Sequence, residues 1–180
     1  MKKKENITNR SLQKTLLELL ETKKFEKITV NDICVRAKIS RTAFYDYYLD
    51  KFDLLLKSMD QLRIDHTVEF QNNHMKIEDI VHSIISNISA NKKIFYNIYS
   101  SRDVDEIRSI HEESFRKRIL FFIENTSLKI KSDMPVDVIA ILCCSGVVII
   151  LRSWILMLNS YSEEEIIEFL VVYLYNNIID

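Results

Sequence analysis

The chain contains a single glycine, Gly146, and a single proline, Pro135, among its 180 residues. Tight β-turns draw on Gly for positive φ angles and on Pro for a fixed φ, so this chain has almost no material for hairpins. Hydrophobic residues make up 47% of the sequence, which is enough for a core. We therefore predict an all-α protein. One glycine also cannot build a phosphate-binding loop or a nucleophile elbow, and we expect no enzyme and no catalytic residue.

Apolar residues recur at helical spacing along the chain and predict nine helices. The segments TVND at 29–32 and SEEE at 162–165 have the sequence of capping boxes, and Ser40 has the place of a further N-cap. No domain break interrupts the pattern, and we place a head in residues 1–60 and a helical body in residues 61–180. The predicted helices cover about Thr8 to Leu20, 29–37, 40–48, Asp50 to about His74, 77–88, 91–99, 103–128, 135–158 and 162–175.

Charge is distributed unevenly between these two parts. Residues 1–60 hold 13 basic and 9 acidic residues, whereas the remaining 120 hold 12 and 17. A mildly basic end on an acidic body fits a nucleic-acid-binding head. The start of the chain, MKKKENITNR, lacks the apolar region of a secretory signal. It has the composition of a disordered basic end or of an arm that reaches along DNA.

We expect a cytoplasmic protein without a membrane span, a metal or a cofactor. The longest uncharged run, Val138 to Leu151, is shorter than the roughly 18 to 20 residues that a bilayer span needs, and we interpret it as a buried helix. The three cysteines show no disulfide framework. The vicinal pair Cys143 and Cys144 fits small core residues or a redox sensor. The histidines (His66, His74, His82 and His111) share no metal-binding spacing.

The stretch ISRTAFYDYY, residues 39–48, concentrates one Phe and three Tyr behind a Ser-Arg-Thr lead. Together with residues 29–37 it predicts two short helices that cross steeply at a tight turn, as in a helix-turn-helix, whose second helix can enter the major groove of DNA. Phe44 and Tyr48, four residues apart, face inward in this interpretation. Phosphate oxygens and base edges would meet the other faces, which carry Arg41, Thr42, Tyr45 and Tyr47. The alternative is an aromatic core with wet edges.

Residues Ile28 to Leu55, ITVNDICVRAKISRTAFYDYYLDKFDLL, resemble the DNA-binding signature of the TetR/AcrR family of transcriptional regulators. A second stretch, ILRSWILMLNSYSEEEI at 150–166, is similar to the branch related to dihydroxyacetone-kinase regulators. The resemblance implies that Thr29 touches phosphate, that Arg41, Thr42, Tyr45 and Tyr47 face the groove, and that Lys51 clamps a phosphate at a helix start. Two residues depart from the family pattern. Lys38 stands where a turn glycine is usual, and Asp46 places on the recognition helix a carboxylate that would repel phosphate, accept from cytosine or point away.

The resemblance also implies a repressor that binds a palindromic operator on double-stranded DNA as a homodimer and is released by a small ligand. We expect the dimer to form through the last two helices, because Val138 to Leu151 is apolar on every face. Its partner surface on the last helix would consist of Ile166, Ile167, Leu170 and Leu174. We expect an apolar or aromatic ligand, lined by Phe95, Tyr99, Phe115, Phe122 and Trp154. The alternative function is a co-activator or adaptor that binds another protein through its body.

Overall fold

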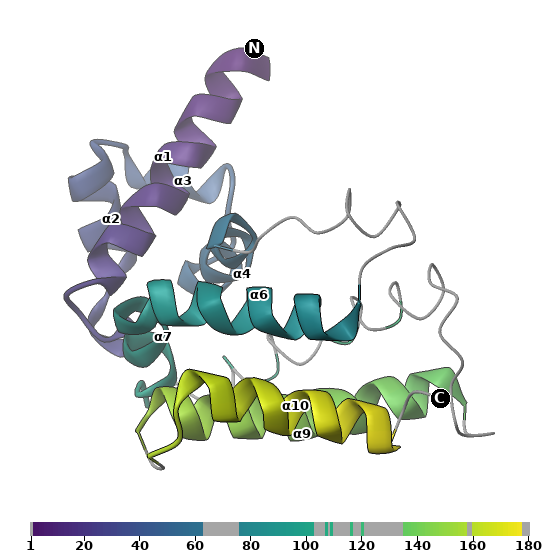
Figure 1. Cartoon of the computed structure of the whole chain (residues 1–180). Coiled ribbons are helices and arrows are strands. Elements are labelled where there is room, and N and C mark those ends of the chain that lie inside the picture. The colour runs from purple at the N-terminus through teal and green to yellow at the C-terminus, as the bar shows by residue number, and fades with distance from the viewer. Residues whose placement is uncertain are drawn as a thin grey trace. The chain divides into compact units, whose positions relative to one another are not determined.

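The computed structural model describes residues 2–62, 76–102, 135–157 and 160–177, and the single positions 107, 109, 116 and 120. Within these ranges the chain forms helices and no strand, so the predicted all-α fold is confirmed. The helices are α1 Lys2–Leu20, α2 Val30–Ala37, α3 Arg41–Tyr45, α4 Lys51–Leu62, α6 Ile77–Ala90, α7 Lys92–Tyr99, α9 Val136–Ile155 and α10 Glu163–Asn177, with a 3-10 turn η1 at Phe25–Lys27 (Figure 1). The helix predicted over 103–128 lies almost entirely outside the described residues.

The chain divides into two compact units. The first contains Met1–Arg63 and Asn91–Ile107, and the second contains Ile64–Ala90 and Arg108–Asp180. Helix α7 therefore packs with the N-terminal helices, although it follows α6 in the sequence. The functional division between residues 60 and 61 stays a prediction, because packing units and functional units need not coincide.

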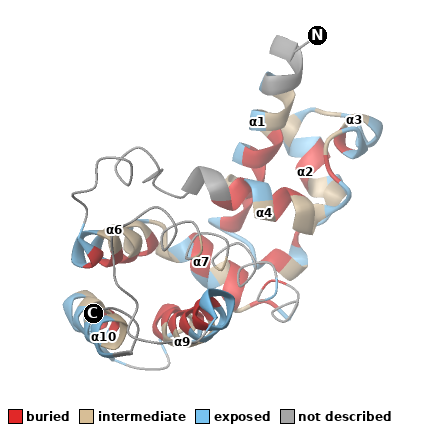
Figure 2. Cartoon of the chain, turned by 90° about the vertical axis from the view of Figure 1, so that its right-hand side faces the viewer, coloured by how far each residue is buried: buried red, intermediate tan, exposed pale blue. Residues whose placement is uncertain are grey.

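The core of the first unit forms on one face of α1, against which α2, α4 and α7 pack. The leucine stripe of α1 is buried, as its spacing predicts, and Figure 2 shows buried residues along α1, α2 and α4. Burial of each such side chain contributes about 1.5 to 3 kcal/mol before the entropy of ordering is counted. Among the described residues of this unit, the large apolar side chains that are fully buried are Leu12, Leu16, Leu20, Phe25, Ile28, Ile33, Phe44, Leu54, Leu55, Ile98 and Ile107.

The predicted start of α1 is wrong. The helix begins at Lys2, so Thr8 and Asn9 lie inside it and do not cap it. The physical reason is that the preceding Lys and Glu residues are good helix formers and no Gly or Pro stops the helix among them. The predicted start of α4 is correct. The Asp50 carboxylate accepts the backbone N–H groups of Phe52 and Asp53, both at 2.8 Å.

In the second unit α10 lies alongside α6 (Figure 1). The predicted capping box opens α10: the Ser162 hydroxyl accepts the Glu165 N–H at 3.2 Å, and the Glu165 carboxylate accepts the Ser162 N–H at 2.7 Å. Glu163 beside them ties α10 to α6, because its two oxygens accept the hydroxyls of Ser86 and Ser89 at 3.1 and 2.5 Å.

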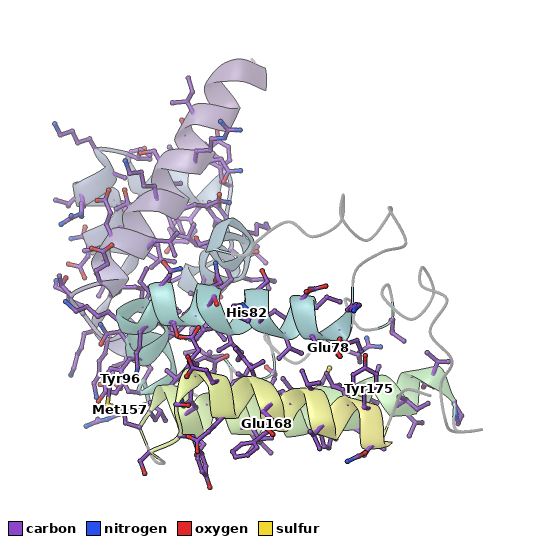
Figure 3. The ribbon with its side chains drawn as sticks, in the orientation of Figure 1. Glu78, His82, Tyr96, Met157, Glu168 and Tyr175 are labelled. Atoms are coloured by element: carbon purple, nitrogen blue, oxygen red, sulfur yellow. The ribbon has the colours of Figure 1, made fainter. Side chains whose placement is uncertain are left out.

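Further along, the Tyr175 hydroxyl donates to Glu78 at 3.2 Å and joins the same two helices again (Figure 3). Gly146 has a packing role on α9, since a Cβ at this position would lie 3.1 Å from the Tyr173 hydroxyl oxygen on α10.

The surface predicted to pair the last helix with a second copy needs correction. Ile166 and Leu170 are 0% and 3% exposed within the chain itself, because they form the face of α10 that packs inward. Ile167 and Leu174 are half-buried. The apolar residues that α10 exposes are Phe169, Val172 and Tyr175 instead. Periodicity alone could not separate these two faces, because both are apolar.

One helix of the described ranges, α9, is long and apolar enough to cross a membrane by length and composition. The uncharged run of the sequence is shorter than this helix, because the helix extends past Asp137 and Arg152 to a length of 20 residues. The length argument against a span is therefore wrong. Half of its apolar window is buried inside the protein, and the core helix of a soluble protein passes the same test. The buried residues include Cys143 and Cys144, and burial raises the pKa of the Cys143 thiol to about 11.

Candidate nucleic-acid interface

Helix α2 begins with the predicted capping box. The Thr29 hydroxyl oxygen accepts the Asp32 N–H at 3.1 Å, and the Asp32 carboxylate accepts the Thr29 N–H at 2.9 Å and the Thr29 hydroxyl hydrogen at 2.8 Å. These bonds, first from the backbone N–H and then from the hydroxyl, hold the pKa of Asp32 below its usual value. Thr29 is exposed, but its hydroxyl hydrogen is already donated to Asp32.

The turn between α2 and α3 is made by a left-handed lysine. Lys38 has φ 56° and ψ 42°, the conformation that the missing glycine would adopt. The turn closes the end of α2, since the Lys38 N–H donates to Val35 O at 3.2 Å and the Ile39 N–H donates to Cys34 O at 3.0 Å. A left-handed non-glycine residue costs roughly 1 to 2 kcal/mol. This turn is the expected joint of a helix-turn-helix, and it carries strain that a glycine would avoid.

Helix α3 is shorter than predicted. Ser40 caps it as expected, with its hydroxyl accepting the Ala43 N–H at 3.1 Å, but the helix ends at Tyr45. Tyr47 therefore lies in the turn that follows and not on the helix, with its N–H donated to Phe44 O at 3.0 Å. Asp50 caps α4 only a few residues later.

The side chains of this segment divide into two faces as predicted. Phe44 and Tyr48 are buried, with ring centroids 5.8 Å apart. Arg41, Thr42 and Tyr45 are exposed. Tyr47 is half-buried, and Asp46 is exposed at the end of α3. The exposed face thus brings one guanidinium, one hydroxyl and one phenol together, which is the chemistry that meets phosphates and base edges.

Lys51 is held by a contact that the sequence did not indicate. It is the first residue of α4, as predicted, and its ammonium donates to Phe25 O at 3.2 Å and lies 4.4 Å from the centroid of the Phe25 ring. The Phe25 ring packs edge-on against Phe52, with centroids 5.1 Å apart. Residues 25 and 51 belong to different elements, and no local spacing links them. The ammonium is therefore positioned at the start of α4 by η1.

Another basic residue of α2 is occupied elsewhere. The guanidinium of Arg36 donates through Nε and Nη2 to the Glu18 carboxylate at 3.2 and 3.1 Å. This pair joins α2 to α1, and a charge already paired with a carboxylate is a weaker partner for phosphate. Arg41, in contrast, is exposed at the start of α3, and it is the arginine that we predict to contact DNA.

The predicted ligand-lining residues that the structure describes are divided between the two units. Phe95 and Tyr99 are buried on α7 in the first unit. Trp154 is buried on α9 in the second unit, where its indole N–H donates to Tyr161 O at 3.1 Å. Phe115 and Phe122 lie outside the described residues.

The end of α7 is hydrogen bonded to the segment that follows α1. The Asn97 amide donates to Leu20 O at 2.8 Å, the Glu26 N–H donates to the Ser101 hydroxyl at 3.1 Å, and the Arg102 N–H donates to the Glu26 carboxylate at 2.7 Å. The last of these bonds is the main cause of a lowered pKa at Glu26. Sequence reasoning missed this connection, because more than 70 residues separate its two sides.

Comparison with solved structures identifies the fold. No family model matches the sequence, and no curated protein matches it. Solved structures do match over nearly the whole chain. The dihydroxyacetone kinase operon activator DhaS aligns with a TM-score of 0.60 at 19% identity, over 94% of this chain and 95% of that chain.

Two further structures agree. A TetR transcriptional regulator from Streptococcus agalactiae aligns with a TM-score of 0.61 at 19% identity, over 96% of both chains. NalD from Pseudomonas aeruginosa, the secondary repressor of the MexAB-OprM multidrug efflux pump, aligns with a TM-score of 0.57 at 11% identity, over 97% of both chains. The chain therefore has the fold of TetR-type regulators, as the resemblance of residues 28–55 implies.

Substitution of Lys38 by glycine tests the strain in the turn. We expect Lys38→Gly to raise the free energy of unfolding by about 0.5 to 1 kcal/mol, because relief of the left-handed strain exceeds the entropic cost of a new glycine. Urea denaturation followed by circular dichroism measures this change as a higher midpoint at an unchanged slope. Lys38→Ala is the control, since alanine keeps the strain. A glycine variant less stable than the alanine variant would show that the turn is unstrained.

The capping box of α2 makes stability depend on pH. Asp32→Ala removes the acceptor of the two Thr29 bonds and is expected to cost about 1 kcal/mol at pH 7. Because the folded pKa of Asp32 lies below its ordinary value of 3.8, this stabilisation is complete above about pH 3.8 and is lost as the pH falls through the folded pKa. Urea midpoints of the parent and the variant should thus converge in acid. Asn31→Ala in the same turn is the control, and a gap independent of pH would contradict the assignment.

Proposed function

We propose that this chain is a cytoplasmic DNA-binding transcriptional regulator, which binds a palindromic operator as a homodimer and represses by occupying the promoter. The observation that carries the proposal is the two-faced segment from Ser40 to Tyr48. Phe44 and Tyr48 are buried in the head, whereas Arg41, Thr42 and Tyr45 are exposed. The segment follows α2, which begins with a capping box. The fold supports the same function, because solved structures that share it are described as transcriptional regulators.

In this proposal α3 enters the major groove, and the helix starts on either side of it meet the backbone. The first turns of α2 and α4 carry the positive end of a helix dipole, which favours phosphate oxygens. Lys51 adds a charge at the start of α4. Arg41 is the residue best suited to a bidentate contact with guanine, with Thr42 and Tyr45 beside it. Thr29 would meet phosphate through its capped helix start, and Tyr47 from the turn after α3.

The apolar surface that the second unit leaves exposed supports the proposed dimer. On α9, Ile141, Leu142 and Ile149 are 51%, 52% and 64% exposed, and they recur at helical spacing on one face. Phe169 and Val172 of α10 are exposed too. A second copy that covers these residues buries the same patch twice around a two-fold axis, and a two-fold protein reads a palindromic site.

Release by a ligand is the remaining part of the proposal. An apolar or aromatic molecule that contacts α7, which carries Phe95 and Tyr99, would act on the head through the bonds of Asn97 and Glu26. Such a ligand changes DNA binding only if it prefers one state of the head over the other. Couplings of this kind are typically about 1 to 3 kcal/mol.

Selection of DNA fragments by the purified protein tests the function directly, and titration of the selected operator tests the residues. We expect Arg41→Ala to weaken operator binding by roughly 1 to 3 kcal/mol. Lys51→Met keeps the side-chain stem against Phe25 and removes the charge, so it should lower the slope of log affinity against log salt by about one unit. Fluorescence anisotropy over a range of salt concentrations measures both effects.

Lys93→Met is the matched control, because Lys93 is an exposed lysine on α7 and lies outside the helix-turn-helix. Selection of no sequence by the parent would overturn the function. Equal affinities and slopes for the parent, Arg41→Ala and Lys51→Met would overturn the recognition surface.

A charge introduced at Leu142, on the exposed apolar face of α9, tests the dimer. Leu142→Glu should convert a dimer into a monomer at micromolar concentration in sedimentation velocity, because a second copy would bury the carboxylate unpaired. Ile7→Glu is the matched control, since Ile7 is also an exposed apolar residue but lies on α1. A parent protein that sediments only as a monomer would remove the homodimer. DNA binding that then requires a second protein would favour the adaptor function instead.

A further inference from the structure

The hydroxyl of Tyr48 joins the end of the recognition segment to α1. Tyr48 is 2% exposed, and its hydroxyl accepts a hydrogen bond from the Gln13 amide at 2.9 Å and donates one to the Asn9 side-chain oxygen. Gln13 is itself 8% exposed. Asn9 and Gln13 are four residues apart and thus lie on the same face of α1. These bonds span 35 and 39 residues of sequence.

The ring of Tyr48 is held separately from its hydroxyl. It packs on Phe44, and the Lys57 ammonium of α4 lies 5.2 Å from its centroid. A phenylalanine at this position would keep both ring contacts. The hydroxyl therefore adds directional hydrogen bonds, which the ring contacts alone do not provide. Burial raises the pKa of Tyr48, so the hydroxyl keeps its proton and remains a donor near neutral pH.

Helix α3 depends on such an anchor more than a long helix would. It has five residues, far fewer than the roughly 12 to 15 at which an isolated helix becomes even marginally stable. Its orientation comes from its neighbours. Phe44 supplies a non-directional apolar contact, whereas hydrogen bonds of the kind that Tyr48 makes specify one arrangement when every member is satisfied.

We propose that Tyr48 is a positioning residue for DNA recognition: its hydroxyl, bonded to Gln13 and Asn9, fixes α3 against α1 so that Arg41, Thr42 and Tyr45 are set for the groove before DNA arrives. The inference rests on the proposed function. Preorganisation of this kind raises affinity because the cost of ordering the segment is met on folding and not on binding. The contact itself adds no charge and reaches no phosphate.

The test is Tyr48→Phe, which removes only the hydroxyl. We expect operator affinity to fall about 2- to 10-fold, the range that one net hydrogen bond corresponds to. The salt slope should stay unchanged, because no phosphate contact is lost. Gln13→Met should have a similar effect. The double variant should be no weaker than Tyr48→Phe alone, because the bond between Gln13 and Tyr48 is already lost in that variant.

Ser58→Ala is the matched control. Ser58 is fully buried and its hydroxyl donates to Leu54 O at 2.7 Å, so the variant also loses one buried hydrogen bond, but within α4. We expect it to lower the melting temperature and to leave operator affinity unchanged. Equal losses of affinity in Ser58→Ala and Tyr48→Phe, or additive losses in the double variant, would reduce Tyr48 to a general contribution to stability.

Amide hydrogen exchange without DNA separates this inference from the proposed function. The amides of residues 43–48 should exchange faster in Tyr48→Phe than in Ser58→Ala. If the parent selects no DNA, the proposed function fails, and faster exchange still supports the positioning of α3. If the parent binds its operator and Tyr48→Phe matches it in both affinity and exchange, the inference alone is wrong.

Discussion

The first unit depends on the apolar face of α1. Leu12, Leu16 and Leu20 are fully buried, and α2, α4 and α7 pack on the helix that carries them. Several other connections in this unit involve the same helix. Arg36 reaches Glu18, Tyr48 reaches Gln13 and Asn9, and Asn97 reaches Leu20. Helix α3 packs on α2, which packs on α1, so the exposed face of α3 depends on α1 for its position.

Much of this architecture could be predicted because a capped helix start depends only on residues that are neighbours in the sequence. A capping box needs only the residues of one turn, so the starts of α2 and α10 could be predicted at Thr29 and Ser162. Lys38 was singled out by the family resemblance, because it stands where a turn glycine is usual. Burial of Phe44 and Tyr48 followed from their spacing of four residues. The caps and the turn are determined by contacts within a few residues in the chain.

What the sequence could not provide is determined by contacts over long separations. The placement of Lys51 depends on Phe25, and the network of Tyr48 depends on a part of α1 where a helix start was expected. The two faces of α10 illustrate the same limit. Ile166 and Leu170 are as apolar as Phe169 and Val172, and tertiary packing, in which α10 lies against α6, decides which pair is covered. Periodicity shows that a helix has an apolar face, but it does not name the partner.

A physical route from α7 to the start of α4 emerges from contacts inside the first unit. The Glu26 carboxylate accepts the Arg102 N–H, and the Glu26 N–H donates to Ser101, so η1 is bonded to the end of α7 through both groups of one residue. The neighbouring Phe25 lies beneath the Lys51 ammonium and accepts its hydrogen bond.

A displacement of α7 would therefore either break the bonds of Glu26 or carry η1 with it. In the second case the support of Lys51 moves, and the charge at the start of α4 moves with it. The proposed regulation requires two states that differ at the DNA-facing residues. This chain of bonded neighbours would provide a difference of that kind, because it links the segment after α7 to the charge at the start of α4.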